Sequence, residues 1–204
     1  MVYILEDTDM LDEESIAAHY NQLSLQRLRK LDSLKKAPAR VNAAAVYLLL
    51  RYALKNEYGI DSAPDFIFKK NGKPYLKDNE DIFFNLSHSR NSCACIVSDS
   101  ETAVDIAEFR KVSMNTAKYY CSPAEFDMIE SIEDQTERNR ELIRIWSIKE
   151  CCSKIDGSGL SMNFKSVESK KLDNIHVING ERYYAAYYSQ TEQNIIKPVL
   201  SDLL

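Results

Sequence analysis

The stretch PARVNAAAVYLLLRYALKNEYG, residues 38–59, constrains the fold more than any other part of the chain. Pro38 stands at a position that the first turn of a helix tolerates, and Gly59 is a typical helix end. Alanine and leucine are so frequent between them that the helix must be largely buried. Such a helix needs a second layer to cover it, and short apolar runs separated by polar turns follow it. We expect strands at residues 66–68, 82–86, 93–97 and 102–106, the last three as an antiparallel meander.

The second half of the chain repeats this order of elements. Ser122, Pro123 and Glu125 form the pattern of a helix start with a capping box, and a long helix is expected at residues 137–155, before Gly157. Strand-like runs follow at residues 164–167, 175–178, 182–188 and 195–199. Helices followed by strands in both halves predict an α+β fold. We expect two similar α+β lobes, residues 1–100 and 101–204, each with a small antiparallel sheet packed against helices.

The composition is that of an ordinary globular protein, with 45% hydrophobic and 28% charged residues among 204. No run of about 18 apolar residues occurs, so no membrane span is expected. The start MVYILEDTDM lacks the basic and apolar regions of a signal peptide, so we expect a cytoplasmic chain whose five cysteines are reduced thiols. Thirty-one acidic against 26 basic residues give a net charge of −5, which argues against indiscriminate binding of nucleic acid.

Positive charge is concentrated in one short segment. Residues 26–40 contain six basic residues against Asp32 alone, whereas residues 125–141 contain seven acidic residues against two arginines. The basic segment is consistent with a solvated helix face or with a site for an anion. Its basic residues are Arg27, Arg29, Lys30, Lys35, Lys36 and Arg40.

The long helix of the second half carries the first candidate site. Trp146, Glu150 and Lys154 are spaced by four residues and therefore line one face of that helix. In one interpretation Trp146 is a core anchor, and Glu150 forms a surface ion pair with Lys154. In the other, this face offers a carboxylate to a metal ion and a lysine to a phosphate, beside a rigid aromatic ring.

Asp105 lies in the apolar run Ala-Val-Asp-Ile, residues 103–106, and is the second candidate. A carboxylate in a buried strand is costly unless a partner or a cation neutralises it. Strand alternation places Asp105 and Ala107 on one face and Glu108 on the other. Asp105 is therefore the stronger candidate for a metal ligand, and Glu108 reaches the same ion only if the strand bulges or ends there.

The segment Asn-Leu-Ser-His-Ser, residues 85–89, is the third candidate. Ser87, His88 and Ser89 offer several hydrogen-bond donors to an oxyanion at a strand end, although a single histidine in a loop is more often a surface residue. The sequence has no GxSxG, Walker or GxGxxG motif, so serine hydrolases, P-loop enzymes and dinucleotide binders lack support. Its cysteines do not have zinc spacing and are expected to be small buried residues.

Taken in order, these segments resemble the 4′-phosphopantetheinyl transferases of the larger, surfactin-synthetase-activating type. That family has a strand G-[IV]-D-[IV], a helix start F-S-x-x-E and a helix W-x-x-K-E-x-x-x-K. The corresponding segments here are residues 103–106, 122–125 and 146–154. Arg40, the Gly72-Lys73-Pro74 segment and residues 85–89 stand where the family contacts coenzyme A. The resemblance covers about residues 25–165.

The resemblance implies an active site between two lobes and transfer of 4′-phosphopantetheine from coenzyme A to a serine of an acyl or peptidyl carrier protein, with release of adenosine 3′,5′-bisphosphate. Asp105 and Glu150 would bind magnesium or manganese, with Glu108 as a further candidate, and Glu150 would also serve as the base. The resemblance assigns the pyrophosphate to Lys154 and Ser87, the 3′-phosphate to His88, Arg40, Lys30 and Lys36, and the adenine to Gly72, Lys73 and Pro74. Because one chain holds both lobes, a monomer is expected.

Two positions depart from the family pattern. Ala103 replaces the glycine of the strand, and Ala107 replaces the second acid, two residues after Asp105. The smaller holo-acyl-carrier-protein-synthase branch has D-I-x-E, which residues 105–108 resemble. We therefore expect an active enzyme with a weaker or more hydrated metal site, and the alternative is a non-catalytic homologue that binds coenzyme A or a carrier protein. A metal-dependent nuclease or phosphatase is disfavoured by the scarcity of clustered acids and histidines.

Overall fold

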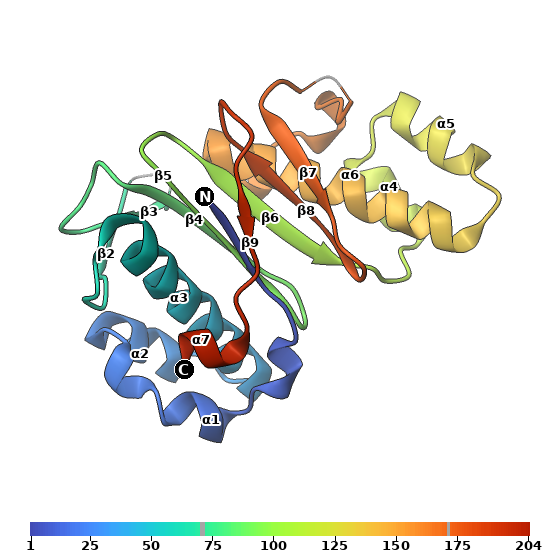
Figure 1. Cartoon of the computed structure of the whole chain (residues 1–204). Coiled ribbons are helices and arrows are strands. Elements are labelled where there is room, and N and C mark those ends of the chain that lie inside the picture. The colour runs from blue at the N-terminus through green and yellow to red at the C-terminus, as the bar shows by residue number, and fades with distance from the viewer. Residues whose placement is uncertain (70–71, 171) are drawn as a thin grey trace.

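The computed structural model describes residues 1–69, 72–170 and 172–204, and Figure 1 shows two groups of elements side by side. Each group has one 22-residue helix, α3 (Ala37–Tyr58) or α6 (Gln135–Asp156), packed against a small sheet. The fold is therefore α+β, as the order of helices and strands predicts. The other α-helices are α1 (Glu13–Ala17), α2 (Leu25–Asp32), α4 (Met114–Tyr120), α5 (Pro123–Ser131) and α7 (Leu200–Leu203).

The first sheet has four strands in the order β4-β5-β1-β9. These strands are β1 (Val2–Leu5), β4 (Phe83–His88), β5 (Cys93–Ser98) and β9 (Ile195–Ile196). Strands β4, β5 and β1 are antiparallel neighbours, and β9 pairs parallel with β1. Because side chains alternate along a strand, Tyr3 and Leu5 face α3 in one core cluster, whereas Val2 and Ile4 face away from it. A hairpin of β2 (Phe66–Phe68) and β3 (Pro74–Leu76) lies beside this sheet.

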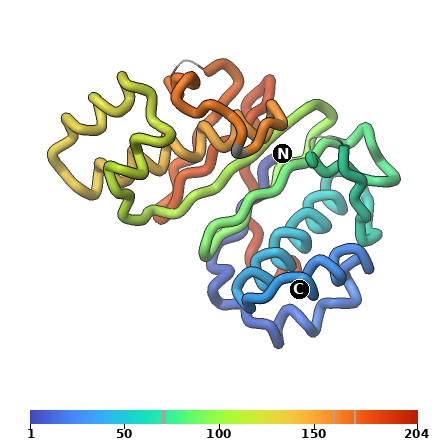
Figure 2. The backbone as a smooth tube through the Cα atoms, turned by 180° about the vertical axis from the view of Figure 1, so that it is seen from behind, coloured from blue at the N-terminus to red at the C-terminus, as the bar shows by residue number. Residues whose placement is uncertain are grey.

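The second sheet has three antiparallel strands in the order β6-β8-β7, with β6 (Ala103–Glu108), β7 (Ile175–Asn179) and β8 (Tyr183–Tyr188). Helix α6 covers one face, where Ile148 and Cys151 pack on Ala103. The opposite face carries Val104 and Ile106, which pack against the side of the first sheet that α3 leaves free. The molecule is thus layered as helix, sheet, sheet and helix, and Figure 2 shows the two sheets meeting along its middle.

Two details of the predicted strands are wrong. Residues 102–106 do not continue the meander of β4 and β5, because β1 occupies the free edge of β5 and pairs Val2 with Ile96. Strand β6 pairs with β8 instead, in the other sheet. Residues 164–167 are not a strand, because Phe164–Ser166 form a short 3-10 helix whose first carbonyl accepts a hydrogen bond from Lys149. The strands at residues 66–68, 175–178 and 182–188 and both long helices are confirmed.

The last part of the chain returns to the first half of the molecule. Strand β9 extends the first sheet, and α7 packs against α3 (Figure 1). Thus the first half includes the C-terminal elements in its packing, and a boundary near residue 100 stays a prediction. Among the described residues, none of the helices combines the length and the apolar character that crossing a membrane requires.

Candidate active site

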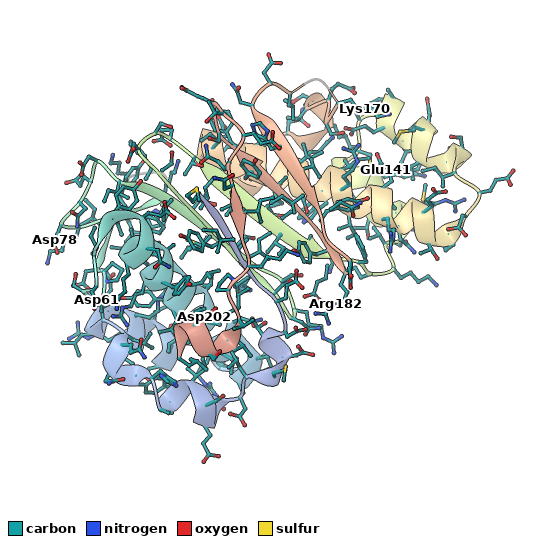
Figure 3. The ribbon with its side chains drawn as sticks, in the orientation of Figure 1. Asp61, Asp78, Glu141, Lys170, Arg182 and Asp202 are labelled. Carbon is teal, nitrogen blue, oxygen red and sulfur yellow. The ribbon has the colours of Figure 1, made fainter. Side chains whose placement is uncertain are left out.

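A cavity of about 910 Å³ opens between the two halves of the molecule. It is lined by the start of α3, the turn between β4 and β5, the end of β6, helix α6 and the turn between β7 and β8. Among the lining residues are His88, Asp105, Trp146, Glu150 and Arg182. Arg182 is labelled in Figure 3 at the lower end of this junction, where its guanidinium pairs with Asp7 of the other half. Residues of all three candidate sites therefore line this one cavity: Trp146 and Glu150 of the long helix, Asp105, and His88.

Asp105 stands on the face of β6 that helix α6 covers, as strand alternation predicts. Only 6% of its surface is exposed, so its charge requires partners. Its Oδ1 accepts hydrogen bonds from the hydroxyl of Ser87 at 2.9 Å and from the ammonium group of Lys154 at 2.8 Å. The carboxylate is thereby held at the cavity wall in one orientation.

Glu150 lies on α6 and reaches the same cavity, but it is much less well compensated. Its Oε1 is buried and has no hydrogen-bond partner within the described residues. Burial, reinforced by the nearby charge of Asp105, raises the pKa of Glu150, and Lys154 offsets only part of this effect. A half-buried carboxylate with one unpartnered oxygen, beside a second carboxylate, fits a divalent cation, because two acid ligands with water and substrate oxygens are the donor set that magnesium prefers.

Lys154 and Trp146 complete the face of α6 that the spacing of four residues predicts. The ammonium group of Lys154 donates to the carbonyl of Val104 at 2.9 Å as well as to Asp105. Lys154 is therefore paired with Asp105 of the strand that α6 covers, and the alternative of a surface ion pair with Glu150 is wrong. The ring of Trp146 packs edge-on against Tyr120 and also lines the cavity. Both interpretations of Trp146 thus apply at once, since it is a core anchor and a wall of the site.

His88 and Ser87 end β4 at the cavity but play different parts. His88 lines the cavity. The surrounding protein desolvates its ring and, with the cations of Lys154 and Arg27, lowers the pKa of His88. Ser87 lies behind it, 8% exposed, with its hydroxyl engaged by Asp105. Ser87 thus contacts the candidate metal ligand directly.

Glu108 lines the same cavity as Asp105 and Glu150, at the end of β6, but its carboxylate is engaged elsewhere. Strand β6 stays in regular register with β8 through Glu108, so its side chain points to the face opposite Asp105. Its Oε1 accepts hydrogen bonds from the backbone N–H of Asn91 at 2.6 Å and from the hydroxyl of Ser92 at 2.9 Å. In the described ranges no group of three His, Cys, Asp or Glu side chains is arranged to hold a metal ion. Glu108 thus stays a further candidate ligand, and Asp105 and Glu150 are the two acids on which the site is built.

The remaining residues assigned by resemblance are spread around the first half. Arg40 pairs with Glu13 and donates to the carbonyl of Leu34 at 2.6 Å. Lys73 pairs with Glu101. Lys36 precedes α3, and Gly72 adopts a left-handed conformation with φ 79° before β3. None of these four residues lines the cavity of Asp105 and Glu150.

Lys30 and Pro74 line a second cavity of about 350 Å³, which sequence reasoning missed. Arg27 lies over the rings of Tyr47 and Phe66 at its wall, at 4.7 and 5.4 Å from their centroids. Burial lowers the pKa of Arg27. Arg27 and Lys30 are three residues apart on α2, and that spacing within the basic segment was the signal that could have indicated this cavity.

A buried ion pair supports α6 behind the cavity, and sequence reasoning assigned it no role. The ammonium group of Lys149 is fully buried and donates to Glu125 at 2.5 Å and to the carbonyls of Tyr120 and Phe164 at 2.7 and 2.8 Å. Glu125 also closes the predicted capping box of α5 and accepts from the N–H of Ser169. Every Lys149 proton has an acceptor, so this lysine holds four segments together around the helix that carries Glu150.

The raised pKa of Glu150 leads to a stability prediction. A carboxyl group whose folded-state pKa lies above its unfolded value costs no stability below the unfolded pKa, and its cost develops as the pH rises through the folded pKa. We therefore expect Glu150→Gln to raise the melting temperature of the metal-free protein at pH 7 to 8 by a few degrees. The difference should vanish near pH 4. An equal gain at both pH values would show that charge is not its cause.

The fold and the cavity define a class of protein: two α+β lobes with a pair of carboxylates at their junction, suited to a divalent cation and an anionic ligand. A model of the 4′-phosphopantetheinyl transferase superfamily matches residues 101–198, which include both carboxylates. The second half of the chain is therefore similar to this superfamily.

Curated relatives carry the same description. A 4′-phosphopantetheinyl transferase of Bacillus subtilis is 30% identical over 131 residues, which are 64% of this chain and 58% of the relative. The 4′-phosphopantetheinyl transferase Sfp of Bacillus subtilis (strain 168) is 29% identical over 120 residues, 58% of this chain and 53% of the relative. The L-aminoadipate-semialdehyde dehydrogenase-phosphopantetheinyl transferase of Candida glabrata is 29% identical over 135 residues, which are 63% of this chain and 52% of the relative. The matched part spans little more than half the length of these relatives.

Proposed function

We propose that this protein transfers the 4′-phosphopantetheine moiety of coenzyme A to a serine of an apo carrier protein. The observation that carries the proposal is the convergence of Asp105 and Glu150, from separate segments of the chain, on one cavity where a buried oxygen of Glu150 has no partner within the described structure. The similarity to the superfamily supplies the reaction class. The carrier serine attacks the phosphorus next to pantetheine, and the bond to the departing adenosine 3′,5′-bisphosphate breaks.

Asp105 and Glu150 would hold magnesium, or manganese in its place, which stabilises the negative charge that develops on the phosphoryl oxygens. Glu150, or a water that it orients, would take the proton of the carrier serine. Its raised pKa favours this role, because a carboxylate of ordinary pKa is a weaker base. Lys154 orients Asp105, and its ammonium group adds positive charge where the pyrophosphate would bind.

The coenzyme's adenosine end would bind in the first half of the molecule. His88 lines the main cavity, and Lys30 and Pro74 line the smaller one. By resemblance to the family, the 3′-phosphate would contact His88, Lys30, Lys36 and Arg40. The adenine would contact Gly72, Lys73 and Pro74. The excess of positive charge in residues 26–40 supports an anion in this region.

Both walls of the cavity come from one chain, so we infer that a monomer is sufficient for transfer. Direct mass measurement tests the activity. The chain is incubated with coenzyme A, magnesium and each of several apo acyl and peptidyl carrier proteins, and the carriers are weighed. We expect a mass gain of one phosphopantetheine on at least one carrier, abolished by a chelator. No gain on any carrier that a known transferase modifies would contradict the proposal.

Ala107 favours a second candidate, a non-catalytic homologue that binds coenzyme A or a carrier protein. Ala107 lines the cavity on the same strand as Asp105, so an acid at this position would face the same space. We expect Ala107→Glu to lower the magnesium concentration for half-maximal transfer about tenfold, because a third carboxylate strengthens the site. If wild type binds coenzyme A without turnover and Ala107→Glu restores transfer, the second candidate is correct.

A further inference from the structure

Strands β4 and β6 run side by side along the junction but belong to different sheets (Figures 1 and 2). Each strand is the outer strand of its own sheet, β4 of the first and β6 of the second. An outer strand presents a row of backbone N–H groups that its own sheet does not use. Because these N–H groups of β6 lie in the interior of the molecule, they require acceptors from elsewhere.

The acceptors are side chains of β4. The N–H of Val104 donates to the amide oxygen of Asn85 at 3.1 Å, and the N–H of Ile106 donates to the hydroxyl oxygen of Ser87 at 3.3 Å. The N–H of Glu108 donates to the hydroxyl oxygen of Ser89 at 3.1 Å. Side chains on one face of a strand, and free N–H groups on one edge of a strand, both recur at every second residue. Acceptors at residues 85, 87 and 89 therefore match the free N–H groups of residues 104, 106 and 108. We name Asn85, Ser87 and Ser89 the side-chain seam.

We propose that the side-chain seam positions Asp105 for metal binding by fixing the register and the edge of β6. Its members thus act as acceptors toward β6, and the hydroxyl groups of Ser87 and Ser89 each keep one proton to donate. The seam bonds the N–H groups on both sides of Asp105, those of Val104 and Ile106. A slip of β6 by one residue would turn Asp105 to the opposite face of the sheet.

The hydroxyl group of Ser87 both accepts a hydrogen bond from the backbone of β6 and donates one to Asp105. Its oxygen accepts from Ile106, and its single proton is donated to Oδ1 of Asp105 at 2.9 Å. Asn85 has no such contact with Asp105 and acts only through the backbone of Val104, which makes it a positioning residue. Asn85 and Ser87 are 7% and 8% exposed, so water does not readily replace either acceptor. The role of the metal ion in this inference rests on the proposed function.

The test combines manganese binding, followed by electron paramagnetic resonance, with amide hydrogen exchange followed by NMR on the intact chain. The pair Ser87→Thr and Ser87→Val compares two side chains of nearly equal shape, of which only threonine keeps the hydroxyl group. Asn85→Leu removes the acceptor that does not contact Asp105. Thr102→Val serves as the matched control, because it removes a buried hydroxyl that donates to the carbonyl of Tyr188, outside the seam.

We expect Ser87→Val and Asn85→Leu to weaken manganese binding about tenfold or more, the usual effect of removing a group that orients a metal ligand. The amides of Ile106 and Val104 should lose protection about tenfold in the respective variants. Ser87→Thr and Thr102→Val should stay within about twofold of wild type in manganese binding. Unchanged binding and unchanged protection in Asn85→Leu, or equal losses in Thr102→Val, would overturn the seam. If wild type binds no manganese, the proposed function and the positioning of a metal ligand both fail; exchange at Val104 and Ile106 then shows whether the seam survives as a structural element alone.

Discussion

Glu150→Ala is expected to lower the rate of phosphopantetheine transfer by about 10²- to 10⁴-fold, the range found when a positioned general base is removed. Glu150 supplies one of the two proposed metal-binding carboxylates and the candidate base, so both contributions are lost together. The loss should fall on kcat more than on KM for coenzyme A, since a base acts in the transition state. Single-turnover transfer to an apo carrier protein, followed by mass spectrometry, measures the effect.

Glu137→Ala is the matched control for this variant. Glu137 lies in the first turn of the same helix, is exposed, and is remote from the cavity lining. Its removal should leave transfer within about twofold, the scale of an ordinary surface substitution. A Glu150→Ala enzyme that kept most of its rate would show that the reaction does not use this carboxylate.

Lys149→Met is expected to destabilise the fold by about 3–5 kcal/mol, although Lys149 is next to Glu150 in sequence and does not line the cavity. The variant leaves Glu125 buried without its cation and leaves two carbonyls without their donor. Urea unfolding measures the loss. The control is Lys165→Met, which replaces an exposed lysine and should change the free energy of unfolding by less than about 0.5 kcal/mol.

Acid provides an independent check on the same ion pair. Burial alone would raise the pKa of Glu125, but hydrogen bonds from Lys149, Ser169 and Ser122 outweigh burial and lower this pKa. A lowered carboxyl pKa contributes stability above its unfolded value, and that contribution is lost as the pH falls through the folded pKa. Wild type should therefore lose stability below about pH 4.3, the ordinary pKa of a glutamate, more steeply than Glu125→Gln. Parallel acid profiles of the two proteins would contradict the pairing.

Local patterns were sufficient to predict much of the site. Strand alternation correctly separates Asp105 from Glu108, because β6 has no bulge up to its last residue. The spacing of four residues correctly places Trp146 and Glu150 on one face of α6, which lines the cavity. The capping box at Ser122 and Glu125 is also present. All of these features depend on residues close together in the sequence.

Features that depend on packing between distant segments could not be predicted in this way. Lys154 fits a surface pair with Glu150 by helical spacing, but it reaches Asp105, 49 positions away, because β6 lies against α6. The prediction that residues 102–106 continue the meander was wrong, because β1, at the start of the chain, pairs with the edge of β5 that β6 would have used. The prediction assumed that strands consecutive in sequence are neighbours in the sheet, which is often the case. The periodicity of the sequence does not show that a distant strand takes the same edge.

The central claim is that Asp105 and Glu150 bind one divalent cation between the two halves of the molecule. A crystal structure of the protein with manganese and coenzyme A, with manganese located by its anomalous scattering, tests this claim most directly. We expect one manganese peak within about 2.3 Å of a carboxylate oxygen from each residue and in contact with the diphosphate. A manganese ion that touches the diphosphate but neither carboxylate, or only one of them, would contradict it.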